Sequence, residues 1–269
     1  MLKLAPILLV ALCHLEAVAQ NPLQNIKPIK SQSCLDYCPY HQNKTNNIIA
    51  DHGIFILSQN KNTKFADWVA YRVIPKNINL AVKTSRYWQK DPKIPQKYAL
   101  IPKDYEGAYQ KCDYDRGHQA PLASFKGADW KKTNYVSNLT PQKADLNRGA
   151  WLKLENYVRQ LVFNKNKIIY VITGTYYDDG EKLCDFKNTR IAGRINYQIP
   201  SGYWKIIAIK EDSQLKIASF IFPQNSQRKD DFCQYQETLE KIENITGLKF
   251  SYSTATFNKF TTSCIIQNI

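Results

Sequence analysis

Short stretches rich in β-branched and aromatic residues, each ended by turn-forming residues, recur along the chain and predict β-strands. They cover residues 53–58, 68–74, 168–173, 203–209 and 217–222. Polar residues occupy positions 59–63 between the first two stretches, which is typical of a hairpin loop that joins neighbouring strands.

Two further stretches have the spacing of helices. Within residues 143–163, apolar side chains recur every three or four positions, at Leu146, Ala150, Leu154, Tyr157, Val158 and Leu161. Residues 235–246 form the second stretch, and Gly247 closes it. Together with the strands, these helices predict an α+β domain with a mixed, largely antiparallel central sheet and flanking helices.

The beginning of the chain has the pattern of a secretory signal peptide. Lys3 precedes an apolar run at 4–12, and three small residues follow at 17–19. The run is too short to cross a bilayer, and no second candidate span is found, so we expect no membrane partner. Acylation of Cys13 is an alternative, but the bulky Leu12 before it disfavours a lipoprotein signal.

The rest of the chain shows no internal repeat and no Pro/Gly-rich linker. The expected organisation is a signal peptide at 1–19, a loose leader at 20–33 and a single domain at 34–269. The protein is therefore expected to be secreted, either to the cell exterior or to the periplasm. Whether it is a monomer or a homodimer is left open.

Removal of the signal peptide leaves an even number of cysteines, namely Cys34, Cys38, Cys112, Cys184, Cys233 and Cys264. An even count in an exported chain favours disulfide bonds, although six thiols allow 15 different pairings. Cys34 and Cys38 are close enough in sequence to form a small loop. A zinc site made of these two cysteines with His41 and His52 is the competing interpretation.

The net charge of +14 requires a partner. Polyanions are natural candidates, because binding phosphates to Lys and Arg releases counterions and long-range attraction speeds encounter. Charge alone does not separate nucleic acid from a membrane surface or a cell-wall polymer.

His118 is the first candidate for chemistry. It follows Asp115-Arg116-Gly117 at the end of an extended segment and lies just before a turn at Gln119-Ala120-Pro121. This position exposes the imidazole at a rim. Because histidine accepts a proton near neutral pH, it suits a base that activates water for attack on a phosphodiester.

Downstream, the predicted helix carries a stripe with four-residue spacing: Asn147, Trp151, Glu155 and Arg159. The Asn147 carbonyl can bind a hard cation such as magnesium, which takes few protein ligands and keeps several waters. On one straight helix Glu155 lies about 12 Å further along the axis. We therefore expect Glu155 to reach the metal only through a water. An ordinary surface pair of Glu155 with Arg159 is the alternative.

Upstream, Arg86 lies beside aromatic residues in the non-helical stretch 83–88. A guanidinium can hold phosphate oxygens through two hydrogen bonds and stabilise charge in the transition state. Alone, Arg86 is one of many surface cations.

The segments 115–124 (DRGHQAPLAS) and 134–151 (NYVSNLTPQKADLNRGAW) resemble the DNA/RNA non-specific endonuclease family, which are secreted ββα-metal nucleases. Further likeness at 63–71, 85–88, 203–205 and 231–234 extends the resemblance over most of residues 34–264.

The resemblance implies a role for each matching residue. His118 becomes the general base, Asn147 the direct magnesium ligand, and Arg86 the contact to the pentacovalent phosphate, with Asn138, Glu155 and Arg159 as supporting site residues and Arg116 as part of the signature. The roles of Asp115 and Arg116 stay open. The resemblance also implies disulfides Cys34–Cys38 and Cys233–Cys264, which by parity leaves Cys112 and Cys184 as a third pair.

The expected activity is hydrolysis of DNA and RNA, without sequence preference, to 5′-phosphorylated products. The cofactor is Mg²⁺, with Mn²⁺ or another divalent cation as substitute. The competing class is a basic secreted protein that binds nucleic acid without cutting it, which cleavage of a plasmid with and without chelator would distinguish.

Overall fold

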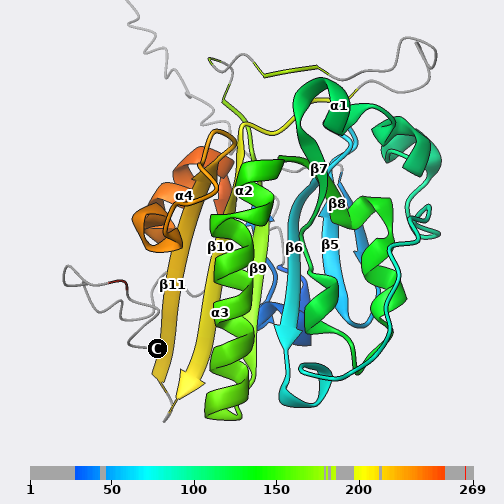
Figure 1. Ribbon diagram of the computed structural model, residues 1–269. Coiled ribbons are helices and arrows are strands. Elements are labelled where there is room, and N and C mark those ends of the chain that lie inside the picture. Colours follow the sequence, from blue (N-terminus) through cyan, green and yellow to red (C-terminus); the bar gives the residue numbers. More distant parts are fainter. Residues whose placement is uncertain are drawn as a thin grey trace, which may run out of the picture.

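A seven-stranded antiparallel sheet forms the centre of the protein, in the order β12-β11-β10-β9-β6-β5-β4 (Figure 1). Its strands are β4 (Ile48–Asp51), β5 (Phe55–Gln59), β6 (Ala66–Val73), β9 (Ile169–Tyr176), β10 (Gly202–Glu211), β11 (Gln214–Pro223) and β12 (Gln236–Glu237). The five strands expected from the sequence are confirmed, and the two edge strands β4 and β12 were missed because they are short. The α+β class with a largely antiparallel sheet is confirmed.

This computed structural model describes residues 28–42, 47–178, 180, 183–185, 197–211, 214–251 and 264. The expected signal peptide lies outside the described residues. Part of the expected leader is described, and it is folded: β1 (Lys30–Ser31) pairs with β2 (Asp36–Tyr37), and a 3₁₀ helix spans Gln32–Cys34. Secondary structure is therefore present before residue 34, within the described part of the expected leader.

Helix α3 (Ala150–Lys165) covers one face of the sheet and lies in front of β9 and β10 in Figure 1. Helix α4 (Leu239–Thr246) packs on the opposite face through Leu239 and Ile242. The hydroxyl of Thr238 accepts a hydrogen bond from Lys241 N and caps α4, and Gly247 ends it with φ +67°. The predicted helix 235–246 is therefore right at its end but begins four residues later than expected.

The predicted helix 143–163 is in fact two helices, α2 (Ala144–Arg148) and α3. Gly149 separates them with non-helical dihedral angles, φ −103° and ψ −118°. A Cβ at this position would lie 2.3 Å from Asp145 O and 2.8 Å from Arg228 Cα, so only glycine fits between these backbones. Asn147 and Glu155 therefore do not share one straight helix, and the expected 12 Å spacing between them does not apply.

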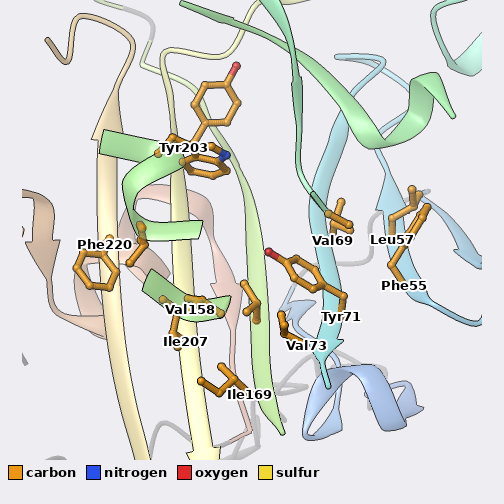
Figure 2. Packing of buried hydrophobic residues seen from close by; sticks show 14 of the residues in the cluster. Phe55, Leu57, Val69, Tyr71, Val73, Val158, Ile169, Tyr203, Ile207 and Phe220 are labelled. Atoms are coloured by element: carbon orange, nitrogen blue, oxygen red, sulfur yellow. The ribbon is translucent and has the colours of Figure 1, made fainter. Parts of the chain in front are cut away.

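Side chains alternate between two apolar layers. In β6, Val69 and Tyr71 face α3, whereas Trp68 and Ala70 join the layer beneath α4. Figure 2 shows Tyr71 on the same side as Ile207 of β10, where Val158 of α3 packs. Because both faces are covered, the central strands consist almost entirely of buried residues.

A separate hairpin carries the candidate histidine. Strand β7 (Tyr114–His118) pairs antiparallel with β8 (Leu139–Lys143), and α2 follows directly, which gives the expected ββα order. Two buried hydroxyls hold β8: Tyr105 Oη donates to Leu139 O at 2.9 Å, and Tyr203 Oη donates to Pro141 O at 2.7 Å. The hairpin is thereby fixed to the sheet and to the 3₁₀ helix Pro102–Tyr105, which precedes α1 (Ala108–Cys112).

The six cysteines between residues 34 and 264 are paired, as Cys34–Cys38, Cys112–Cys184 and Cys233–Cys264. This confirms the disulfide interpretation and all three pairings. The alternative zinc site was wrong, because two of its four ligands are in a disulfide and no metal-binding group of three or more His, Cys, Asp or Glu occurs among the described residues. Across the described ranges, no helix has the length and apolar character needed to span a bilayer.

Candidate active site

The turn that follows His118 is held by Asn138. Asn138 is fully buried, and its Oδ1 accepts from Ala120 N at 2.8 Å while its Nδ2 donates to Ala120 O and Thr133 O, both at 2.9 Å. The backbone carbonyl of Asn138 accepts a hydrogen bond from Gln119 N at 2.9 Å. All polar atoms of the amide are thus used by the backbone, which suits a residue that positions His118 rather than one that touches a substrate.

His118 is half-buried at the end of β7 and packs against Trp88, with 5.5 Å between the ring centroids. Its Nε2 is shielded from solvent and has no hydrogen-bond partner among the described residues. Burial, together with the positive charge of Arg86, lowers the pKa of His118 to about 4, against a smaller opposing effect of Asn134. The imidazole is therefore neutral at pH 7 and able to accept a proton.

Arg86 lies on an exposed segment that is tied to the body of the protein. Gln89 N donates to Asn134 O at 3.1 Å, Val136 N donates to Gln89 O at 2.9 Å, and Asn134 Nδ2 donates to Ser85 O at 2.9 Å. After burial, the charge of Arg86 is the second cause that lowers the pKa of His118, and it is one of several charges that oppose the effect of burial, which raises the pKa of Glu155. The structure therefore brings these three site residues into one electrostatic neighbourhood.

Arg116 lies two residues before His118 on the same face of β7. Its guanidinium carbon lies 5.6 Å from the ring centroid of Trp88 and 5.5 Å from that of Tyr105, and Nη2 donates to Pro102 O at 3.4 Å. Arg116 Nε is buried and has no hydrogen-bond partner in the described chain. Two aromatic rings thus hold a guanidinium beside the candidate base.

Asp115, whose role the sequence left open, orients Asn147. Asn147 Nδ2 donates to Asp115 Oδ2 at 2.8 Å, and Arg148 donates to the same carboxylate from Nε at 2.8 Å and from Nη2 at 2.6 Å. A carboxylate accepts only, so the amide nitrogen must face it and the carbonyl oxygen Oδ1 points elsewhere. Oδ1 receives no hydrogen bond from the described residues and is the type of ligand that Mg²⁺ prefers. Asn147 therefore fits the expected metal.

Glu155 and Arg159 meet a buried lysine that the sequence analysis did not single out. Lys205, on the α3 face of β10, is 1% exposed, and its Nζ lies 3.8 Å from Glu155 Oε1 and 3.7 Å from the Trp151 ring centroid. Burial raises the pKa of Glu155, opposed by Lys205 and Arg159. Burial lowers the pKa of Lys205 to about 8, opposed by Glu155. The alternative of an exposed surface pair between Glu155 and Arg159 does not fit this burial.

Two signals in the sequence could have indicated this arrangement. Lys205 is a lysine in the middle of an otherwise apolar strand, and Trp88 lies two residues after Arg86. Neither signal by itself identifies the partner, because the contacting residues come from distant parts of the chain.

Comparison with known proteins identifies the family and several relatives of this chain. The family model "DNA/RNA non-specific endonuclease" matches residues 38–257. A nuclease from Serratia marcescens is 40% identical over 244 residues, which are 89% of this chain and 87% of that protein. The human mitochondrial nuclease EXOG is 27% identical over 175 residues, covering 61% and 45% of the two chains.

Among solved structures, the EndoG/EndoGI complex contains a chain with the same fold. Its TM-score is 0.61 at 24% identity, and the match covers 75% of this chain and 84% of that chain. The match to the family model spans most of the described chain and includes the β7–β8 hairpin, α2 and α3. This chain belongs to the DNA/RNA non-specific endonuclease family.

Proposed function

We propose that this protein is a secreted endonuclease that hydrolyses phosphodiester bonds of DNA and RNA to 5′-phosphorylated products, with His118 as general base and a magnesium ion at Asn147. The observation that carries the proposal is the neutral His118, whose Nε2 is without a partner in the described chain, beside the charge of Arg86. A base needs a free lone pair at working pH, and this imidazole has one.

In the proposed reaction, His118 Nε2 accepts a proton from the water that attacks phosphorus in line with the leaving 3′ oxygen. The bond between phosphorus and the 3′ oxygen breaks as the new P–O bond forms, and the 3′ oxygen leaves with the electron pair and takes a proton from water. Negative charge then builds on the non-bridging oxygens. Arg86 is exposed and close enough to shift the pKa of His118, so its guanidinium is available to hold those oxygens through charge-assisted hydrogen bonds. Arg116, held between Trp88 and Tyr105, supplies a second cation near the same imidazole.

Asn147 would hold the magnesium ion directly, with its amide oriented by Asp115. When bound, the ion would supply stabilisation of negative charge on the leaving oxygen. Glu155 is kept near the site by Lys205 and Arg159, where its carboxylate can order water. Asn138 positions His118 through the backbone.

The features that support weak discrimination between DNA and RNA are the types of side chain at the site. Guanidinium and ammonium groups recognise phosphates, which both nucleic acids share, and phosphate contacts carry no sequence information. Secretion is supported by the signal-peptide pattern at 1–19 and by three disulfides, which persist in oxidising compartments.

Two substitutions test the proposal, because base and metal ligand act at opposite ends of the same displacement. His118→Ala should lower turnover on plasmid DNA by roughly 10² to 10⁴ fold, retain nucleic-acid binding, and recover in part with added imidazole. The Asn147→Ala variant should need a higher magnesium concentration for cleavage, and added imidazole should not restore its activity. His41→Ala is the control, since His41 bonds to Asp67 at 3.3 Å outside the site.

Normal cleavage by His118→Ala would show that histidine is not the base. A wild-type protein that binds plasmid and RNA but cuts neither with Mg²⁺ or Mn²⁺ would instead support the binding-module interpretation. Treating the products with phosphatase before end-labelling identifies the phosphorylated end.

A further inference from the structure

Three lysines surround one tyrosine outside the candidate site. The Nζ atoms of Lys61, Lys64 and Lys97 lie 5.2, 5.5 and 4.8 Å from the ring centroid of Tyr98. Lys61 and Lys64 come from the β5–β6 loop, and Lys97 from the 3₁₀ helix Gln96–Tyr98. We call these four residues the Tyr98 cluster.

The Tyr98 cluster is held in place by its surroundings. Gln59 Nε2 donates to Tyr98 O at 2.8 Å, which joins the end of β5 to the 3₁₀ helix. Within the loop, Asn60 Oδ1 accepts from Asn62 N at 2.8 Å and from Thr63 N at 3.2 Å. The lysines are therefore presented by ordered backbone, so an anion would find a largely preformed surface.

The charges of Lys64 and Lys97 are poorly compensated by carboxylates. No carboxylate forms an ion pair with Lys64 or Lys97 in the described part of the chain. Lys97 above all, with Lys61 and Lys64, lowers the pKa of Tyr98. A ring quadrupole attracts cations but does not neutralise their charge, so the cluster favours a partner that carries several negative charges.

The Tyr98 cluster is continuous with the candidate site. Tyr98 precedes Pro102 by four residues, a span of at most about 14 Å, and Pro102 O accepts from Arg116. The connecting segment 83–103 contains six cations and a single acid. That acid, Asp91, is buried against His52 at 2.9 Å. Positive charge thus extends from Arg86 to Lys97 without an exposed acid in this segment.

We propose that the Tyr98 cluster binds the phosphate backbone of a nucleic-acid substrate beyond the bond that is cut, which extends the binding surface of the proposed nuclease. The inference rests on the proposed function. One strand of a duplex carries one phosphate per about 3.4 Å of helix axis, so a span of about 14 Å corresponds to about four phosphates between the cluster and Arg116. An anionic lipid surface carries similar charge, but the connection to the site through Pro102 favours nucleic acid.

The test is the triple variant Lys61→Gln, Lys64→Gln, Lys97→Gln. Binding of a fluorescent 30-base-pair duplex to the His118→Ala form should weaken, and the slope of log K against log salt should fall by about two to three, since each phosphate contact contributes about 0.9. When the same triple change is made in the active protein, the decrease in kcat/KM should be about tenfold larger for the 30-mer than for a trinucleotide. A trinucleotide is too short to reach the cluster.

The matched control removes the same charge at the opposite end of the sheet. Lys165, Lys167 and Lys216 all pair with Glu211, at 3.1, 3.2 and 2.9 Å. Their triple replacement by Gln should change the salt slope by less than one. Melting temperatures of both variants check that each is folded.

Equal loss of slope in both triple variants would overturn the proposal, because only net charge would then matter. An equal decrease in kcat/KM for the trinucleotide and the 30-mer would also overturn the proposal. So would binding to phosphatidylserine vesicles that depends on these lysines, if DNA binding did not depend on them. Binding is measured in the inactive His118→Ala form. Failure of the wild type to cut nucleic acid would therefore refute the proposed function, while the binding experiment would still test the Tyr98 cluster.

Discussion

The pKa of His118 is the property on which the proposed mechanism depends most directly. Burial and Arg86 lower it from 6.5 to about 4. This difference corresponds to about 3 kcal/mol, at 1.36 kcal/mol for each pH unit. At pH 7 only about one imidazole in a thousand would then be protonated, compared with about a quarter at the ordinary pKa.

The same shift links His118 to stability. Between about pH 4 and 6.5 the unfolded chain binds the proton and the folded chain does not, so the folded state loses stability as pH falls through this window. Activity follows the same direction, because the neutral form is the base. We expect kcat/KM to rise with pH through about 4 and to be flat from about pH 6 to 8 as far as His118 controls it.

NMR titration of the metal-free protein with labelled histidine measures this pKa directly, and the spectrum of His118→Ala assigns the signal. Arg86→Gln should raise the pKa, because a nearby cation is removed, whereas Lys83→Gln is the matched control on the same segment and should shift it less. A wild-type pKa at or above 6.5, or one that Arg86→Gln does not raise, would refute the reasoning.

Three side-chain contacts give further predictions. Asp115→Ala should raise the magnesium concentration needed for half-maximal activity by roughly 10 to 100 fold, because the Asn147 amide loses the hydrogen bond that orients it. The control Asp129→Ala, which removes an exposed acid elsewhere, should leave this concentration unchanged. Replacing Cys112 and Cys184 by Ser should destabilise the protein by roughly 4 kcal/mol, because the bond closes a separation of 72 residues, and calorimetry that shows no change would contradict this. Lys205→Met and Glu155→Gln should each lower the free energy of unfolding by about 3 to 5 kcal/mol, because each change leaves a buried charge without its partner. The double variant should lose less than the sum of the two single losses. Strict additivity in a double-mutant cycle would show that the pair is not coupled.

Local chemistry explains why much of the fold is predictable from sequence. Alternating and continuous apolar runs correctly indicated five strands of the sheet, and Gly247 correctly marked the end of α4. A cap or a strand face is determined by residues within a few positions of each other, so sequence alone contains the necessary information. The motif around His118 and Asn147 likewise indicated the family before any contact was known.

Local pattern could not reveal contacts with distant residues. The helical spacing of 143–163 runs through Gly149 without interruption, yet the helix breaks there, at a glycine packed against the backbone of Arg228, which comes later in the chain. The segment before His118 was expected to be extended, but it has too few apolar residues to predict that it pairs as strand β7. Its partner in the hairpin is β8, which Tyr105 and Tyr203 hold through hydrogen bonds. Both the helix break at Gly149 and the pairing of β7 with β8 therefore depend on tertiary packing and not on local sequence propensity.

The electrostatic state of the site was decided by tertiary structure alone. Sequence identified His118 and Glu155 as ionisable groups, but their pKa values depend on which groups surround them. Lys205 reaches Glu155 only because β10 and α3 pack face to face, which buries an ammonium that an isolated strand would expose to water. Charge interactions act through space, between residues that are separated along the chain and meet only after it has folded.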